Sequence, residues 1–188
     1  MTASQPVLFV SHEGTRTGAP TMRLHFLRWA QDNTDLEPEI ALLRGGPLAA
    51  EFAELGPTTV LSDEWGWPHT TPAEQALISA GMGKTALSRQ RSRVRHQLAH
   101  VRDAEAVYLN SSASLRILHH LPNAKRVIAH VHELESAFRW SLGPEDPPLL
   151  ASRVDHVVAA ADCVADNLVR NHGVPRERIT RVYEFIER

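Results

Sequence analysis

Three short apolar runs of the sequence are each followed by polar side chains that could bind or activate a ligand. The runs are residues 7–10, 106–109 and 126–131, and they are followed by His12, Glu13, Arg16, Thr17 and Gly18, by Asn110, Ser111 and Ser112, and by His132, Glu133 and Glu135. Because the carboxyl ends of parallel strands meet at one edge of a sheet, we expect these side chains to gather there. Their convergence favours a functional site, although Asn110 and Ser112 could serve only as helix caps and Gly18 only as a turn.

The first of these groups belongs to one strand, loop and helix. Residues 7–10 form an unbroken apolar run, which fits a strand buried on both faces of a parallel sheet. Pro20 stands where a helix can begin, because its missing N–H would have no partner in the first helical turn. Apolar residues from Met22 to Trp29 can supply the buried side of that helix. We therefore expect the loop between them at the ligand-binding edge of the sheet.

Strand and helix patterns alternate along the whole chain. We expect strands at 7–10, 39–43, 58–61, 106–109, 126–131, 156–160 and 180–185, and helices at 21–30, 48–55, 73–80, 84–102, 114–121 and 162–172. The 188 residues are enough for one domain with a sizeable core and too few to expect two. The predicted fold is a single α/β domain, Rossmann-like and doubly wound, with a mainly parallel sheet of about seven strands.

Composition and charge narrow the class of protein. The net charge is −2 with neutral histidines, which gives no indication of nucleic-acid binding. The single cysteine, Cys163, cannot form an internal disulfide and is compatible with a reducing cytoplasm. Residues 1–6 lack the basic start of a signal peptide, and no stretch approaches the roughly 20 apolar residues of a spanning helix. We expect a cytoplasmic protein whose contact with a membrane, if any, is peripheral.

Motifs for nucleotide phosphates and for metals are incomplete. Residues 81–85 resemble the end of a phosphate-binding P-loop, but Ile78 stands where that motif requires glycine, and the preceding residues have a helical pattern. The patterns G-x-G-x-x-G and G-x-S-x-G do not occur. The histidines do not form H-E-x-x-H, and Cys163 has no cysteine partner for a zinc site. We expect no metal and no resident cofactor.

The predicted helix at 84–102 is rich in basic residues. Those on one flank of its apolar stripe are Lys84, Arg91, Arg95 and Arg102. Such a flank is typical of a surface for anionic lipid head groups. Arg89 and Arg93 lie on the opposite side, so the alternative is a solvated helix with snorkelling side chains.

The loop at residues 62–72 carries two tryptophans and has no periodicity. Trp65 and Trp67 could pin this loop to the body of the protein. They could also stack on a ligand or touch a membrane, since each indole is large, apolar and equipped with one polar N–H group.

Several segments, taken in combination, resemble the retaining glycosyltransferases of family 4, which have the GT-B fold. S-H-E-G-T-R-T-G-A-P is similar to the start of that family, and Y-L-N-S-S and A-H-V-H-E-L-E are similar to its fourth and fifth strand ends. V-V-A-A-A-D-C-V-A-D-N-L, followed by H-G-V-P-R-E-R-I-T-R-V-Y-E-F-I, resembles the segment that precedes its second domain. One departure is Ala161, where the family often has Ser or Thr, so Asp162 is expected to cap the helix instead.

The resemblance implies that residues 1–188 are the N-terminal, acceptor-side domain of a two-domain enzyme. The family's C-terminal domain binds the nucleotide sugar, partly through two glutamates eight positions apart, and no two glutamates of this chain have that spacing. We therefore expect the donor domain to be absent and the chain alone to be inactive. The implied reaction moves a sugar from a nucleotide sugar to a glycan or lipid-linked acceptor, with retention at the anomeric carbon.

The resemblance also implies roles for residues at the expected sheet edge. His132 would be catalytic, and the backbone N–H groups of Gly18 and Ala19, at a helix N-terminus, would bind the donor diphosphate. The residues expected around the acceptor are Glu13, Arg16, Thr17, Asn110, Glu133 and Glu135. His130 shares a side of its strand with His132 but lies deeper, and we expect it to be structural.

A non-catalytic Rossmann-like module that binds a sugar or a partner protein is the alternative from a different class. An encoded second domain would favour the enzyme, and its absence would favour the module. A flavodoxin-like or nucleotide-binding regulator is disfavoured, because the phosphate-binding fingerprints are missing.

Overall fold

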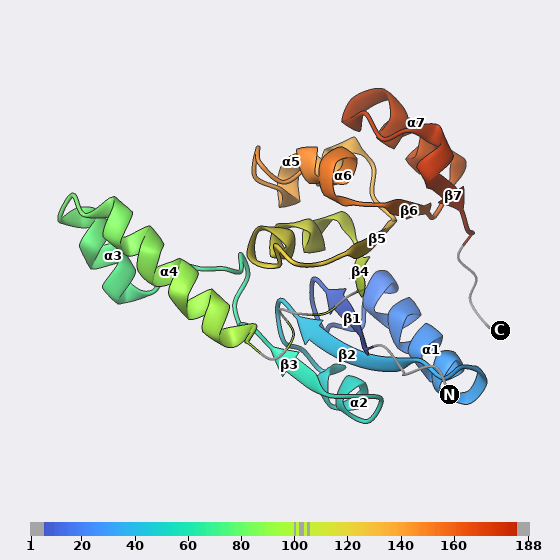
Figure 1. The fold of residues 1–188 in the computed structure, drawn as a ribbon, viewed down its shortest axis with the longest axis horizontal. Coiled ribbons are helices and arrows are strands. Elements are labelled where there is room, and N and C mark those ends of the chain that lie inside the picture. Colours follow the sequence, from blue (N-terminus) through green and yellow to red (C-terminus); the bar gives the residue numbers. More distant parts are fainter. Residues whose placement is uncertain (1–5, 100, 102–103, 105, 184–188) are drawn as a thin grey trace.

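Seven strands form one parallel sheet in the part of the chain that the structure, a computed structural model, describes: residues 6–99, 101, 104 and 106–183. The strands are β1 (Pro6–Ser11), β2 (Glu37–Leu42), β3 (Thr58–Val60), β4 (Ala106–Asn110), β5 (Arg126–Val131), β6 (His156–Ala159) and β7 (Ile179–Arg181). Their order across the sheet is β3-β2-β1-β4-β5-β6-β7 (Figure 1). The direction of winding therefore reverses between β1 and β4, and doubly wound sheets bind ligands at such a reversal.

The carboxyl ends of the three central strands are aligned. Ser11 of β1 lies opposite Asn110 of β4, and Asn110 lies opposite His130 of β5. Both pairings are parallel. The residues that follow these strands therefore leave the sheet at the same edge, as the sequence predicts.

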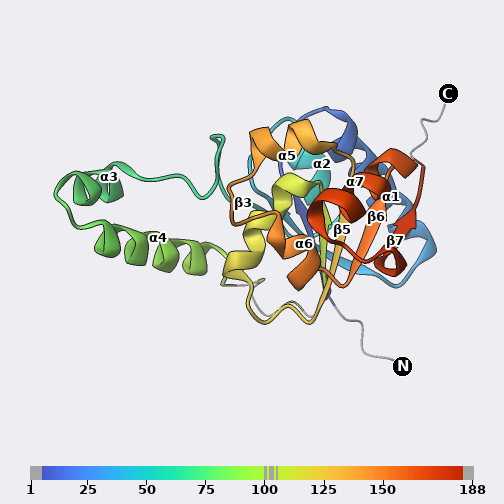
Figure 2. The ribbon, with the colours of Figure 1, turned by 90° about the horizontal axis from the view of Figure 1, so that it is seen from above.

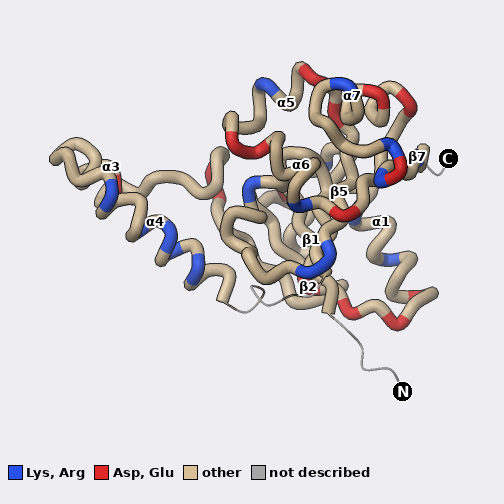
Figure 3. Tube along the Cα trace, turned by 45° about the horizontal axis from the view of Figure 1, so that its top comes forward, with Lys and Arg blue, Asp and Glu red and all other residues tan. Residues whose placement is uncertain are grey.

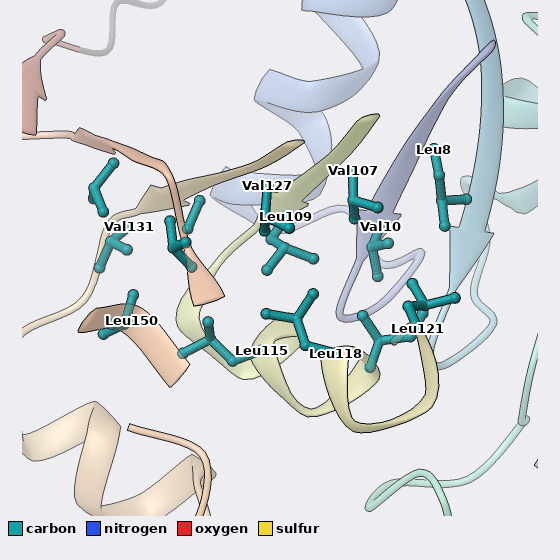
Figure 4. Close-up of a cluster of buried hydrophobic side chains, with 14 of the residues drawn as sticks. Leu8, Val10, Val107, Leu109, Leu115, Leu118, Leu121, Val127, Val131 and Leu150 are labelled. Carbon is teal, nitrogen blue, oxygen red and sulfur yellow. The ribbon is translucent and has the colours of Figure 1, made fainter. Parts of the chain in front are cut away.

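Helices cover both faces of the sheet. The helices of the described residues are α1 (Gly18–Asn33), α2 (Ala49–Ala53), α3 (Pro72–Ser79), α4 (Gly83–Gln97), η1 (Ser112–His120), α5 (Glu135–Ser141), α6 (Pro148–Arg153), α7 (Asp162–His172) and η2 (Arg176–Arg178), and all but α3 and α4 lie against the sheet. On one face α1 and α2 pack on a cluster that includes Phe9 and Ile40. On the other face η1, α6 and α7 pack on a larger cluster that includes Val10 and Leu109, part of which Figure 4 shows. Successive strand residues point to opposite faces, so continuous apolar runs are buried on both sides.

Helices α3 and α4 form an arm that extends away from the sheet (Figures 1 and 2). α3 begins with a capping box, in which Thr71 and Glu74 exchange side-chain and backbone hydrogen bonds. Arg93 of α4 pairs with the buried carboxylate of Glu74 at 3.2 Å and holds the two helices together. Gly81, with a φ of +75°, makes the turn between them, a conformation that glycine adopts without strain.

The predicted fold class is confirmed, since one α/β domain carries seven parallel strands with helices on both faces. The sequence prediction misses α5 and α6, which have only 7 and 6 residues and too few turns for a periodic pattern. The predicted helix at 114–121 is the 3-10 helix η1. The helix expected to reach Arg102 ends at Gln97, and Arg102 lies outside the described residues.

One local expectation, the capping role of Asp162, is wrong. Asp162 does not cap α7, because Ala161 occupies the N-cap position and no side chain caps that end. The Asp162 carboxylate instead accepts a hydrogen bond from the Tyr183 hydroxyl at 3.1 Å. Both tryptophans contact the body of the protein: Trp67 is buried, and Trp65 is 60% exposed but stacks on the guanidinium of Arg44 at 3.7 Å.

Candidate functional site

Asn110, the last residue of β4, connects the ends of two strands to the start of α1. Its side-chain oxygen Oδ1 lies 3.3 Å from Nη2 of Arg23 and 3.3 Å from Nε2 of His132. Its side-chain nitrogen Nδ2 donates to the backbone oxygen of Ala19 at 2.8 Å. We call Asn110, Arg23, His132 and Ala19 the Asn110 network. It brings three of the predicted site residues together, and it adds Arg23, which the sequence analysis did not single out.

His132 and His130 lie side by side at the end of β5. Their ring centroids are 4.2 Å apart. Nδ1 of His130 also lies 3.2 Å from the hydroxyl of Tyr108. Burial lowers the pKa of His130 to about 3, and the neighbouring charges of His132 and Arg23 act in the same direction. His130 is therefore a neutral imidazole near neutral pH, whereas His132 lies further out and holds Asn110.

The first turn of α1 is open above Gly18. Thr17 occupies the N-cap position, but its side chain makes no capping hydrogen bond. A Cβ atom added at Gly18 would meet no heavy atom within 4 Å, and Gly18 does not adopt a positive φ. Neither packing nor backbone conformation requires a glycine here, so the missing side chain leaves room for a group from outside the domain. Backbone N–H groups at such a helix start suit an anion.

We expect Gly18→Val to leave the domain folded and to obstruct the approach of an anionic group to the first turn of α1. The substitution should change the free energy of unfolding by no more than about 1 kcal/mol, because the side chain enters open space and valine is a slightly better helix former than glycine. In the two-domain glycosyltransferase that the sequence resemblance implies, we expect the rate of sugar transfer to fall. Thermal unfolding tests the expected stability, and sugar-transfer rates measured on the same preparation test the expected loss of activity. Unchanged activity would remove Gly18 from the site, and lost folding would make it a structural residue.

Glu13 is buried and holds the loop between β1 and α1. Its carboxylate accepts hydrogen bonds from Thr15 at 2.6 Å and Thr17 at 3.0 Å, and it pairs with Arg44 at 2.9 Å. Burial alone would raise the pKa of Glu13, but these hydroxyl groups and the charges of His12 and Arg44 outweigh it, so the pKa is lowered. The ionised carboxylate thus has several partners within the protein already. The same holds for Thr17, whose hydroxyl binds Glu13.

Glu133 fastens the end of β4 to the end of β5. Its carboxylate accepts from the Ser111 hydroxyl, and from the backbone N–H groups of Ser112 at 3.2 Å and His132 at 3.1 Å. Ser111 has a φ of +95°, and its hydroxyl accepts from the N–H of Ala113 as the cap of η1. Glu133 therefore orders the loop from which Asn110 and His132 project.

Arg16 and Glu135 do not join the Asn110 network. Arg16 is exposed and pairs with Glu51 of α2 at 2.8 Å. Glu135, the first residue of α5, pairs with His172 at 2.9 Å and with Arg139 at 3.2 Å. These partners direct both side chains to neighbouring helices, so of the predicted acceptor residues they are the two that the structure places apart.

Arg23 is 4% exposed and lies against aromatic rings. Its guanidinium carbon is 3.9 Å from the ring centre of Tyr108 and 5.3 Å from those of Phe9 and Phe26. No described carboxylate forms an ion pair with it, and burial lowers its pKa. The sequence held a signal for this residue, because Arg23 lies four positions before the buried Leu27 on the same helical stripe.

One cavity adjoins the network, and a larger groove shares part of the lining of that cavity. A cavity of about 210 Å³ is lined by His12, Arg44, Trp65, Arg116 and Trp140 among others, and Nδ1 of His12 lies 3.4 Å from the backbone oxygen of Asn110. A groove of about 850 Å³ begins beside it, and its lining includes Gly66, Trp67, Arg116, Arg91 and Arg95. Two of the basic residues predicted on α4 therefore face this groove.

Neither a metal site nor a membrane span is found in the described part of the chain. No group of three or more His, Cys, Asp and Glu side chains within it is placed to hold a metal ion. Among its helices, none has the length and apolar character needed to cross a bilayer.

Solved structures with the same fold include Alr3699/HepE from Anabaena. The HepE structure in complex with UDP matches with a TM-score of 0.66 and 14% identity, and the one in complex with UDP and glucose with a TM-score of 0.64 and 12% identity. A glycosyltransferase from Rickettsia africae ESF-5 gives a TM-score of 0.49, too low to carry an argument. No protein-family model and no curated protein sequence matches the chain. The HepE matches cover 97% of this chain but only 45% of HepE, so the chain has a Rossmann-like fold that spans under half the length of that protein.

Proposed function

We propose that this chain is the N-terminal, acceptor-side half of a retaining glycosyltransferase of the GT-B type, related to family 4. One observation carries the proposal: Asn110 binds both His132 and the first turn of α1, and the space over Gly18 in that turn is open. A nucleotide-sugar donor is supported by the fold neighbour HepE, which was crystallised with UDP and with UDP-glucose. The single cysteine and a soluble donor of this kind favour the cytoplasm as the site of action.

In the proposed reaction the domain positions the reactants and stabilises charge. The acceptor oxygen bonds to the anomeric carbon as the bond from that carbon to the diphosphate breaks, and the acceptor proton passes to the leaving diphosphate. N–H groups of Gly18 and Ala19 stabilise the negative charge on the phosphate. The Nδ2 group of Asn110 already donates to Ala19, so its Oδ1 accepts from Nε2 of His132 and fixes the orientation of that ring.

Turnover by this chain with and without a donor-binding domain tests the proposal. We expect the purified 188-residue chain to fold and to transfer no sugar from a panel of nucleotide sugars to glycan or lipid-linked acceptors. We expect transfer, with the anomeric configuration retained, when the C-terminal half is present. Turnover by the chain alone would refute the half-enzyme. A two-domain protein that binds sugars but never transfers them would support the non-catalytic module instead.

A second proposal concerns the arm formed by α3 and α4, which we propose contacts anionic membranes. Figure 3 shows basic positions repeated along α4. Lys84, Arg91 and Arg95 are exposed, and none of them forms an ion pair with a described carboxylate. The end of the arm also exposes the apolar side chains Ile78 and Met82. Basic residues beside exposed apolar ones suit the interface of an anionic bilayer.

Replacing the three basic residues tests the membrane proposal. We expect Lys84→Gln, Arg91→Gln and Arg95→Gln together to weaken binding to phosphatidylglycerol vesicles on the order of 100-fold, since each basic residue contributes roughly 1 kcal/mol near such a surface. Binding of the unaltered chain should also weaken as salt is added. Co-sedimentation at low ionic strength measures both.

The matched control removes the same charge elsewhere. Arg28→Gln, Arg139→Gln and Arg170→Gln change exposed residues of α1, α5 and α7. We expect this triple variant to bind vesicles nearly as well as the unaltered chain. Equal losses in both triple variants, or no binding of the unaltered chain at low salt, would leave α4 as a solvated helix.

A further inference from the structure

Two of the tryptophans that line the cavity of about 210 Å³ beside His12 are largely exposed. Trp65, in the loop before α3, is 60% exposed, and Trp140 of α5 is 83% exposed. Both line the cavity, although α5 and that loop are far apart in the sequence. We propose that this cavity is the subsite for a sugar ring of the acceptor, held against the faces of Trp65 and Trp140. The inference rests on the proposed function and extends it, because it makes the acceptor a carbohydrate.

One wall of the cavity is held in place by a stacked guanidinium. The guanidinium carbon of Arg44 lies 3.7 Å from the ring centre of Trp65. Arg44 is itself fixed by its ion pair with the buried Glu13 at 2.9 Å. The indole of Trp65 is therefore supported through a chain of contacts that begins in the loop before α1, while much of its surface stays open to a ligand. A wall ordered in advance loses little entropy on binding.

Arg116 of η1 joins the two walls. Its Nη1 donates to the backbone oxygen of Trp67 at 3.3 Å, and its Nη2 donates to the backbone oxygen of Ser141. Trp67 follows Trp65 by two residues, and Ser141 directly follows Trp140. One side chain thus sets the separation of the segments that carry the two exposed indoles, which makes Arg116 a positioning residue for this cavity.

The chemistry and size of the cavity match a single sugar ring. Aromatic walls with a few polar groups are typical of small-molecule sites, and His12, Glu64 and Ser141 are polar groups in this lining. The C–H face of a pyranose packs against an indole while its hydroxyls bond to polar groups at the edges. The volume of about 210 Å³ is below the roughly 300 Å³ at which sites for larger ligands begin.

The position of the cavity suits an acceptor. His12 lines it and approaches the backbone oxygen of Asn110 at 3.4 Å, so the cavity adjoins the network that holds His132. The larger groove shares Gly66, Trp67 and Arg116 with it. A ring in the cavity can thus present a hydroxyl toward the Asn110 network while the rest of the acceptor follows the groove.

NMR of the indole N–H groups in the 188-residue chain tests this site without any sugar transfer. The probes are the methyl glycosides of glucose, galactose, mannose and N-acetylglucosamine, with glycerol as a polyol that lacks a ring. We expect at least one glycoside to shift the Trp65 and Trp140 signals together and saturably, and glycerol to shift neither. Trp29, which is 56% exposed on α1, supplies the internal control and should not respond.

Matched variants complete the experiment. We expect Trp140→Ala to weaken binding of the responding glycoside at least tenfold and Trp29→Ala to leave it unchanged, since both remove exposed indoles. The inference is overturned if no glycoside moves both signals or if Trp29 moves equally. It is also overturned if Trp140 is covered by a second copy of the chain, seen as a concentration-dependent shift that no sugar alters. Turnover in the presence of the C-terminal half tests the proposed transferase separately, so failure of the cavity and failure of the transferase can be told apart.

Discussion

His132→Ala is expected to lower kcat and kcat/KM together, by on the order of 10²-fold, in the proposed two-domain glycosyltransferase. His132 contacts Asn110 Oδ1 at 3.3 Å beside the open first turn of α1, so its loss removes a preorganised group next to the proposed diphosphate position. A loss in both constants indicates an interaction made in the transition state, whereas a rise in KM alone would indicate ordinary substrate binding. Steady-state kinetics with a nucleotide-sugar donor measures the effect.

His130→Ala is the matched control for this prediction. His130 packs against the His132 ring and bonds to Tyr108, but its imidazole is already kept neutral by burial, with a pKa of about 3. We expect its removal mainly to lower the free energy of unfolding, and to lower kcat much less than His132→Ala does. Full activity of His132→Ala, or a larger loss of kcat for His130→Ala, would place the catalytic group elsewhere.

Gly46→Ala is expected to destabilise the chain by about 3 kcal/mol or more, in the range of the most damaging single substitutions. A Cβ at Gly46 would overlap the backbone oxygen of Gly14 and lie 2.6 Å from its carbonyl carbon. The Gly14 backbone cannot easily retreat, because its N–H donates to Arg44 at 2.9 Å and its oxygen accepts from Leu48 at 2.8 Å. Denaturant unfolding of the chain, followed by circular dichroism, gives the difference.

The control for Gly46 is another glycine with open surroundings. Gly83 begins α4, and a Cβ there would meet nothing within 4 Å. Gly83→Ala should leave stability unchanged or raise it by up to about 1 kcal/mol, because alanine favours the helix. A Gly46→Ala variant within 0.5 kcal/mol of the unaltered chain, the usual range for surface substitutions, would show that the two loops separate easily.

The sheet could be predicted from the sequence because its pattern is local. Runs such as residues 7–10 are apolar throughout, and in a parallel sheet this pattern alone indicates a strand whose two faces are both buried. The helix at 162–172 was predicted to the residue, because Gly173 ends it in the left-handed conformation that glycine favours. Helices α5 and α6 were missed because six or seven residues span too few turns to show a period.

The neighbourhood of the candidate site followed from topology, but the partners of each side chain did not. Parallel strand ends share one edge, so His132 and Asn110 could be expected near the loop that contains Gly18. Nothing local in the sequence indicates that the Glu133 carboxylate binds Ser111 at the end of β4, or that Arg16 pairs with Glu51 of α2. Those choices depend on side chains that approach from other elements. The functional roles of these residues stay predictions.

Arg23 has a consequence for how this sequence can drift. Arg23 is a buried guanidinium without a carboxylate partner, and replacing buried ionic groups by apolar side chains of similar volume is often neutral or stabilising. Selection for the fold alone would therefore tolerate methionine at this position. If the orientation of Asn110 is what selection preserves, descendants that keep Asn110 and His132 should also keep arginine here. Lineages that abandon the Asn110 network should lose all three residues together.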